Sequence, residues 1–96
     1  MKAGLLYLIL LENKLPLNID VIQRHVAHLK ALDGEGGLVA CGPFADYPGG
    51  MVLIKAASAE EAHGIAQNDP FVKEGYKNYS IRTVDWANKG NNYGLE

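Results

Sequence analysis

The chain has 96 residues, which suits one small domain, and 48% of them are hydrophobic against 21% charged. That balance is typical of a globular protein and excludes disorder over most of the chain, because disorder needs low hydrophobicity and high net charge. Nine basic and eleven acidic residues give a formal charge of −2, which argues against nucleic-acid binding. We therefore expect no nucleic-acid partner.

Cysteine content and the longest apolar run bear on the cellular compartment. The single cysteine, Cys41, rules out an internal disulfide and a thiolate metal cluster, so we expect a reducing, cytoplasmic environment. The apolar run from Leu5 to Leu11 is about a third of a membrane span. Met1-Lys2-Ala3 before it slightly resembles a signal peptide, but no small-residue cleavage site follows. We interpret the run as a buried strand and expect no membrane association.

The first half of the chain predicts a strand, a helix and a second strand. The apolar stretch from Gly4 to Leu11 suits a strand buried on both faces or at a subunit contact. Asn18 is a suitable helix N-cap, and apolar residues recur at helical spacing from Ile19 until the glycines beginning at Gly34. The next strand covers Leu38–Phe44 and stops at a Pro- and Gly-rich turn.

The second half predicts a strand, a capped helix and a last strand. Ser58 and Glu61 have the spacing of a capping box, in which each side chain satisfies a free backbone donor of the other residue. The segment around Asp69 and Pro70 ends that helix, and a single helical turn follows Pro70. The three elements are a strand over 51–57, a helix over 58–67 and a strand over 79–86.

The order β-α-β-β-α-β predicts an α+β fold of the ferredoxin-like type. This arrangement is an antiparallel four-stranded sheet with two helices on one face. We assign residues 1–87 to the domain and residues 88–96, which are rich in Gly and Asn, to a mobile C-terminal tail. The final Leu95-Glu96 resembles the remnant of a tag, so we exclude it from functional reasoning.

Two helices can cover only one face of such a sheet, and the strands are too apolar for the other face to meet water. The apolar surplus lies in the runs 5–11 and 51–54. Exposed apolar area on that scale marks an association surface. We expect a homodimer that packs sheet against sheet through the open face; the alternative is a monomer whose own side chains fold over it.

Three histidines are candidates for chemistry. His28 lies at the margin of the apolar stripe of the first helix, where one ring nitrogen can be wet and the other held, as a general base requires. His25 lies inside the stripe, which favours a packed or capping role. His63 has no evident partner and is expected at the surface. The His-x-x-His spacing lacks a carboxylate at ligand distance, so we predict no metal site.

Asp69 and Cys41 each have a structural and a functional interpretation. Asp69 precedes Pro70, which favours an N-cap for the following turn; the functional alternative is a carboxylate that holds a histidine in one tautomer. Cys41 is expected to be a small core residue in its strand. The glycine-rich segment 34–37 follows a helix, so it cannot cradle a phosphate at a helix N-terminus.

A series of short segments stands in a fixed order along the chain: His28-Leu29, Leu32, Gly36–Leu38, Cys41-Gly42-Pro43-Phe44, Gly49-Gly50-Met51, Ala62, Asp69-Pro70-Phe71-Val72 and Gly75. In these segments the sequence resembles the YCII-related (YciI-like) family. The resemblance implies a dimeric α/β barrel built from ferredoxin-like chains, and an active site centred on a histidine and an aspartate, which match His28 and Asp69. The family often has an arginine three residues before the histidine, where this chain has His25 with Arg24 beside it.

The resemblance implies a small dimeric enzyme, of lyase or isomerase type, that moves a proton on a small organic substrate such as a cyclic one. His28 would be the general acid and base, and Asp69 would set its tautomer and stabilise the imidazolium. No cofactor signature is present, so side chains would carry the chemistry. The alternatives are a non-catalytic module that binds a small metabolite and an accessory subunit of a larger enzyme. The substrate-binding candidates are Phe44, Tyr47, Phe71 and Arg24.

Overall fold

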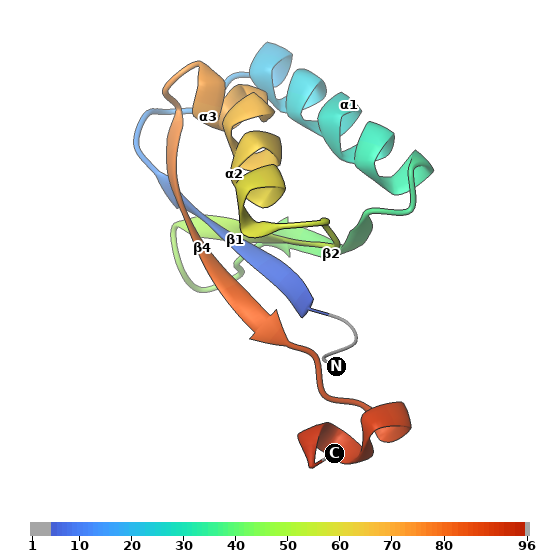
Figure 1. Ribbon diagram of the computed structural model, residues 1–96. Helices are drawn as coiled ribbons and strands as arrows, with labels where there is room; N and C mark the ends of the chain where they lie inside the picture. The colour runs from blue at the N-terminus through green and yellow to red at the C-terminus, as the bar shows by residue number, and fades with distance from the viewer. Residues whose placement is uncertain (1–4, 96) are drawn as a thin grey trace.

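A computed structural model describes residues 5–95 of the chain (Figure 1). The four strands form one antiparallel sheet in the order β2-β3-β1-β4, and Figure 1 shows the α-helices on one side of it, with the C-terminal 3₁₀ helix beyond the end of the last strand. The ferredoxin-like α+β arrangement predicted from the sequence is therefore confirmed. The elements are β1 (Leu5–Asn13), α1 (Ile19–Gly34), β2 (Leu38–Pro43), β3 (Gly49–Ile54), α2 (Ala59–Asn68), α3 (Pro70–Lys73), β4 (Lys77–Asp85) and the 3₁₀ helix η1 (Lys89–Gly94).

Two predictions at the chain ends fall outside the described residues. They are the start of the first strand at Gly4, together with the Met1-Lys2-Ala3 segment, and Glu96 of the expected tag remnant. Within 88–95, where a mobile tail was expected, Asn88 and Asn91 cap η1 by accepting from each other's backbone N–H groups at 3.2 and 3.0 Å. The domain boundary at residue 87 stays a prediction.

Two strands begin earlier than the sequence pattern indicated. β4 begins at Lys77, because the β1–β4 ladder extends to the pair Asn13 and Lys77. β3 begins at Gly49, which the sequence placed in a turn. A Cβ at Gly49 would lie 2.3 Å from the carbonyl oxygen of Leu11, and its φ of +153° is one that side chains rarely permit. A glycine here therefore lets the β2–β3 hairpin approach β1 closely.

The hydrophobic core lies between the sheet and the helices. Alternation along β1 directs Tyr7, Ile9 and Leu11 toward the helices, where all three are buried in the core cluster. Leu6, Leu8 and Leu10 alternate with them on the open face of the sheet. Other members of the core cluster are Val21 and Leu32 of α1, Val52 and Ile54 of β3, Ala62 and Ala66 of α2, and Phe71 of α3.

The open face is apolar and only partly shielded within one chain. Leu8 is paired with Leu53 and Leu10 with Met51 across the β1–β3 ladder. Leu53 is buried, whereas Leu8, Leu10 and Met51 keep part of their surface exposed.

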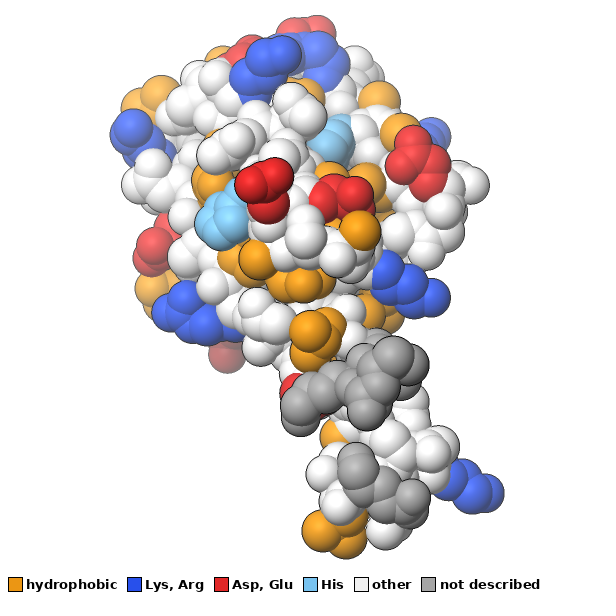
Figure 2. Space-filling view, viewed as in Figure 1, with side chains coloured by type: hydrophobic (Ala, Val, Ile, Leu, Met, Phe, Trp, Pro, Cys, Tyr) orange, Lys and Arg blue, Asp and Glu red, His pale blue; other side chains and the backbone are white. Residues whose placement is uncertain are grey.

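The molecular surface seen in Figure 2, in the same view as Figure 1, carries interspersed acidic and basic side chains. No helix within residues 5–95 is long and apolar enough to cross a membrane.

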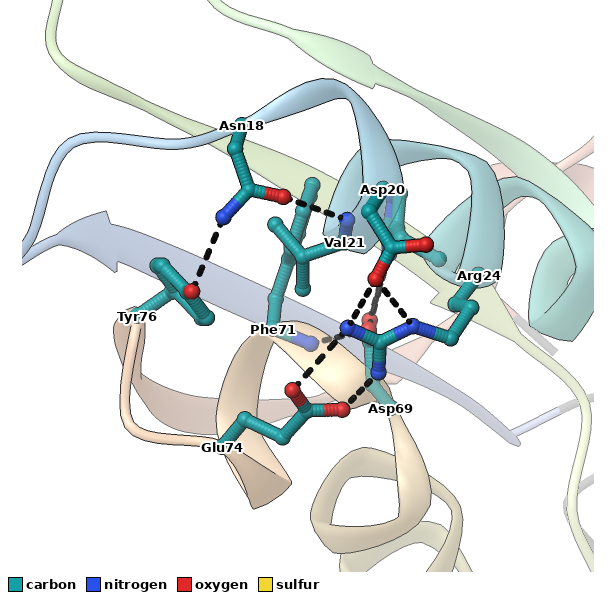
Figure 3. Close-up of polar contacts among 9 residues, drawn as sticks. Asn18, Asp20, Val21, Arg24, Asp69, Phe71, Glu74 and Tyr76 are labelled. Atoms are coloured by element: carbon teal, nitrogen blue, oxygen red, sulfur yellow. Dashed lines mark hydrogen bonds and ion pairs between the residues drawn. The ribbon is translucent and has the colours of Figure 1, made fainter.

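Both predicted helix caps are present, one of them in altered form. The Asn18 side chain accepts a hydrogen bond from Val21 N at 2.9 Å and donates one to the Tyr76 hydroxyl at 3.0 Å (Figure 3). The Ser58 hydroxyl accepts from Glu61 N at 3.1 Å, as predicted. The Glu61 carboxylate, however, accepts from Ala57 N at 3.1 Å rather than from Ser58 N, so the capping box is only half formed.

Cys41 was predicted to be a core residue, and this was wrong. The sheet order places β2 at an edge, where Cys41 is exposed. Cys41 lies opposite the core residue Val52 and so on the same face of the sheet, but it lines a hollow there that the helices do not fill.

Candidate functional site

A cavity of about 370 Å³ lies between α1 and the β2–β3 side of the sheet. Such a volume suits a small organic molecule. Its wall is largely apolar, and the side chains that carry nitrogen are those of His25 and Lys77. The remaining lining residues are Leu11, Leu17, Ile22, Val26, Leu29, Cys41, Gly42, Pro43, Gly50, Met51, Val52 and Phe71.

A histidine and an aspartate from distant parts of the chain meet at this wall. Nδ1 of His25 lies 2.8 and 2.9 Å from the two carboxylate oxygens of Asp69. Their side chains are 13% and 4% exposed, so the contact is shielded from water. A carboxylate only accepts, so Nδ1 donates and the opposite nitrogen, Nε2, is left as the basic atom. Nε2 has no hydrogen-bond partner within residues 5–95.

The local sequence explains why Asp69 can hold the histidine. Pro70 occupies the first position of α3, and Asp69 before it is extended, with φ −64° and ψ 126°. One Asp69 oxygen accepts from Phe71 N at 3.0 Å, so the residue caps α3 as the structural interpretation predicted. The same carboxylate contacts His25. The cap and the tautomer-holding role, weighed above as alternatives, are thus compatible in one side chain.

Phe71 supports the His25 ring from α3. The two rings are stacked, with centroids 3.9 Å apart and planes inclined by 13°. Phe71 is 5% exposed and belongs to the core, so it offers a rigid surface for the imidazole. Stacking and the Asp69 contact together restrict both the tilt and the rotation of the His25 ring. Phe71, a predicted substrate-binding residue, lines the cavity directly.

His28 was predicted to be the partner of Asp69, and the structure assigns that contact to His25. His28 is half-buried, makes no hydrogen bond within residues 5–95 and does not line the cavity. Burial lowers its pKa below 6.5; the Asp69 charge opposes that shift, and His25 adds a smaller decrease. The prediction failed because the cavity faces the middle of the apolar stripe, where His25 lies, rather than its margin.

Arg24, a predicted substrate-binding residue, lies outside the cavity wall and forms ion pairs with two acidic residues. Its guanidinium donates to Asp20 at 3.0 and 3.2 Å and to Glu74 at 3.0 Å, with a second contact to Glu74 (Figure 3). These bonds connect α1 to the residue that follows α3, close to Asp69. Arg24 does not line the cavity, because its side chain runs along the outer surface.

Phe44 and Tyr47 lie beside the cavity rather than in it. They line a second, more open hollow of about 430 Å³ under the β2–β3 loop, where their rings meet edge to face at 6.4 Å. Both side chains are exposed. The two hollows share Leu17, Pro43 and Lys77, so a ligand in the main cavity could extend toward this pair.

Lys77 is a site residue that the sequence reading missed. It is 7% exposed, and its ammonium lies 4.7 Å from the centre of the Phe71 ring. Burial lowers its pKa, and the Asp69 charge partly opposes this shift. The alternation of Lys77, Tyr79 and Ile81 is the signal that places Lys77 on the core face of β4. A strand that begins at Tyr79, as the sequence predicted, does not include it.

The remaining titratable candidates lie elsewhere. His63 is exposed on α2, as expected, and its Nδ1 lies 2.9 Å from the Tyr79 hydroxyl. In the part of the chain that the structure describes, no group of three or more His, Cys, Asp or Glu side chains could hold a metal ion.

Comparison with known proteins finds a relative of similar sequence, a solved structure of similar fold and a matching family model. The uncharacterized protein YjpA of Bacillus subtilis (strain 168) is 35% identical over 83 residues, which cover 86% of this chain and 95% of YjpA. The solved structure of 5-chloro-2-hydroxyhydroquinone dehydrochlorinase (TftG) from Burkholderia phenoliruptrix AC1100, in complex with 2,5-dihydroxybenzoquinone, matches with a TM-score of 0.64 and 26% identity. That match covers 91% of this chain and 99% of TftG. The model of the YCII-related domain matches residues 5–86, and the chain therefore belongs to the YCII-related family.

Proposed function

We propose that the protein is a small-molecule enzyme of lyase or isomerase type, in which His25 transfers a proton and Asp69 holds it in place. The observation that carries this proposal is the shielded His25–Asp69 contact at the wall of an apolar cavity, with Nε2 unbonded within residues 5–95. The proposed pair differs from the sequence-based hypothesis in the histidine used, His25 in place of His28.

The proposed chemistry follows from the two ring nitrogens. Nε2 of His25 takes a proton from a carbon or hydroxyl of the substrate, and the Asp69 charge stabilises the imidazolium that forms. The electron pair left behind moves to the adjacent bond. A leaving group then departs in a lyase reaction, or the proton returns at another atom in an isomerase reaction. The scheme needs no cofactor.

A compact ring is the substrate class that the comparisons support. TftG is named for the dehydrochlorination of a chlorinated, hydroxylated ring, and its structure holds a second hydroxylated ring. A cavity of about 370 Å³ with an aromatic wall suits such a molecule. The apolar wall also suits a module that binds a small metabolite without turning it over, and the experiment below distinguishes the two.

The test uses 5-chloro-2-hydroxyhydroquinone under anaerobic conditions, with chloride release and exchange of ring protons for deuterium as readouts. His25→Gln should lower the rate by about 100- to 10,000-fold, and His63→Gln, a control on the surface of α2, should leave it unchanged. Losses for His25→Gln and Asp69→Asn should be strongly non-additive, because each residue needs the other. Full activity in His25→Gln would refute the proposal. Binding of 2,5-dihydroxybenzoquinone without turnover of any hydroxylated ring would favour the binding module.

We further propose that the protein acts as a cytoplasmic homodimer joined through the open face of the sheet. Support comes from the apolar, partly exposed Leu8, Leu10 and Met51 on that face, while the lone cysteine favours a reducing compartment. Sedimentation equilibrium at micromolar concentration should give about twice the chain mass. Leu8→Asp should dissociate the dimer, and Ile19→Asp, at an exposed aliphatic residue, should not. A monomeric wild-type protein would refute this proposal.

A further inference from the structure

We propose that Lys77 binds an anionic oxygen of the ligand, and that the cavity selects small planar organic anions through a carboxylate or an ionised hydroxyl group. This inference rests on the proposed function only in placing a ligand in the cavity. It holds for an enzyme and for a binding module alike.

Lys77 is a largely buried lysine whose charge has no direct partner within residues 5–95. Lys77 is 7% exposed, and lysines buried to that degree are almost always paired. Within residues 5–95, its ammonium forms no hydrogen bond and no ion pair, and its described contact is the Phe71 ring at 4.7 Å. A cation over an aromatic face gains a modest attraction. No side-chain nitrogen or oxygen of the described residues is both fully buried and unbonded, so the ammonium itself remains accessible from the hollows that Lys77 lines. The ammonium thus keeps its hydrogen-bonding capacity for a ligand.

The carboxylate that could have neutralised Lys77 is already engaged. Both oxygens of Asp69 contact His25 Nδ1, and one of them also accepts from Phe71 N. Asp69 acts on Lys77 through its field, which raises the pKa of the lysine, while burial lowers it. Asp46 shares the outer hollow with Lys77 but forms no ion pair with it. An incoming anion would therefore supply the first direct counter-charge.

The position of Lys77 tells where the anionic group would lie. Lys77 lines both the main cavity and the outer hollow, so this residue lies at their boundary. The Phe71 ring contacts both groups: His25 is stacked on it, and the Lys77 ammonium lies over it, so one aromatic side chain of the cavity wall connects the two nitrogen-bearing residues. A planar ligand could lie against the apolar wall with its anionic oxygen at Lys77 and a reacting atom near His25. Binding such an anion would also favour proton removal at a conjugated atom, because Lys77 would stabilise the charge that develops.

The test compares benzoate with benzamide, two probes of the same shape of which only the first is charged. Isothermal titration calorimetry and amide chemical shifts of cavity residues such as Gly42 and Phe71 report where each binds. Wild-type protein should prefer benzoate by about tenfold or more, since a hydrogen bond to a charged group is stronger than a neutral one. Lys77→Met should abolish that preference and leave benzamide affinity within about twofold. Lys73→Met, at an exposed lysine of α3, should change neither.

Two further variants keep the outcome decisive. Lys77→Arg should retain the preference for benzoate, and Lys77→Gln should lose it as Lys77→Met does. Equal affinity of the wild type for the two probes, an unchanged preference in Lys77→Met and Lys77→Gln, or the absence of benzoate binding at millimolar concentration would each overturn the inference. Loss of turnover in His25→Gln with intact benzoate selectivity supports Lys77 as an anion site. Selectivity in a wild type that turns nothing over refutes the proposed enzyme but not the role of Lys77.

Discussion

Removal of the Asp69 side chain tests the dual role of this carboxylate as a helix cap and a histidine partner. In Asp69→Ala the cap on Phe71 N is lost, which costs about 1 kcal/mol. The bond to His25 Nδ1 is also lost, and a hydrogen bond that involves a charged group contributes about 1.5–3 kcal/mol. Because Asp69 is 3% exposed, water cannot readily replace either bond. The expected loss of unfolding free energy is about 3 kcal/mol in total.

Asp69→Asn separates the two contributions. An asparagine keeps an oxygen that can accept from Phe71 N but removes the negative charge that faces His25, so its loss should be about 1 kcal/mol. The assay is urea denaturation followed by circular dichroism, with thermal melts as a second readout. For a domain of this size, a loss of about 3 kcal/mol lowers the melting temperature by about 12–24 °C.

A matched control variant and a double variant separate the coupling between Asp69 and His25 from the general effect of removing an aspartate. Asp33→Ala, at an exposed aspartate near the end of α1, should change stability by less than about 0.5 kcal/mol. In a His25→Ala background, Asp69→Ala should cost only the cap, about 1 kcal/mol. If Asp69→Ala cost no more than Asp33→Ala, or if its cost were unchanged without His25, the coupling between cap and histidine would be refuted.

Three further predictions concern stability. Ser58→Ala removes the acceptor for Glu61 N and should cost about 1 kcal/mol in urea denaturation; a cost of zero would contradict the observed cap. The folded-state pKa of His28 lies below its usual 6.5, so the unfolded chain takes up the proton first as the pH falls. Stability should decline from neutral pH through 6.5 toward the folded pKa, less steeply in His28→Gln, and an equal slope in both proteins would count against this burial effect. Lys77→Met removes the desolvation cost of a largely buried cation, about 1–3 kcal/mol, and loses about 1 kcal/mol of cation–π attraction to Phe71. The free energy of unfolding at pH 7 should therefore rise by about 1 kcal/mol. A destabilised Lys77→Met would mean that the ammonium is well solvated.

The order of elements and most of their ends could be predicted because they depend on neighbouring residues. Helical spacing after Asn18, the S-x-x-E pattern at Ser58 and the proline after Asp69 each act within one or two turns of chain. The errors lie where distant parts of the chain decide. The early start of β4 follows from its ladder with β1, and Cys41 is exposed because it lines a hollow that the helices do not fill. Neither the ladder nor the hollow is visible in a local window.

In the candidate site, too, some features depend on neighbouring residues and others on tertiary packing. The sequence by itself determined that Asp69 would be held extended before Pro70, because the proline restricts the residue before it, and it favoured a cap there without excluding a contact with a histidine. Only the tertiary structure decided that His25 rather than His28 meets that carboxylate, and that Lys77 reaches the same cavity. The choice between two histidines three residues apart depends on the angle at which α1 crosses α3 and the sheet. That angle is set by the packing of many side chains at once, so no spacing within the helix could reveal it.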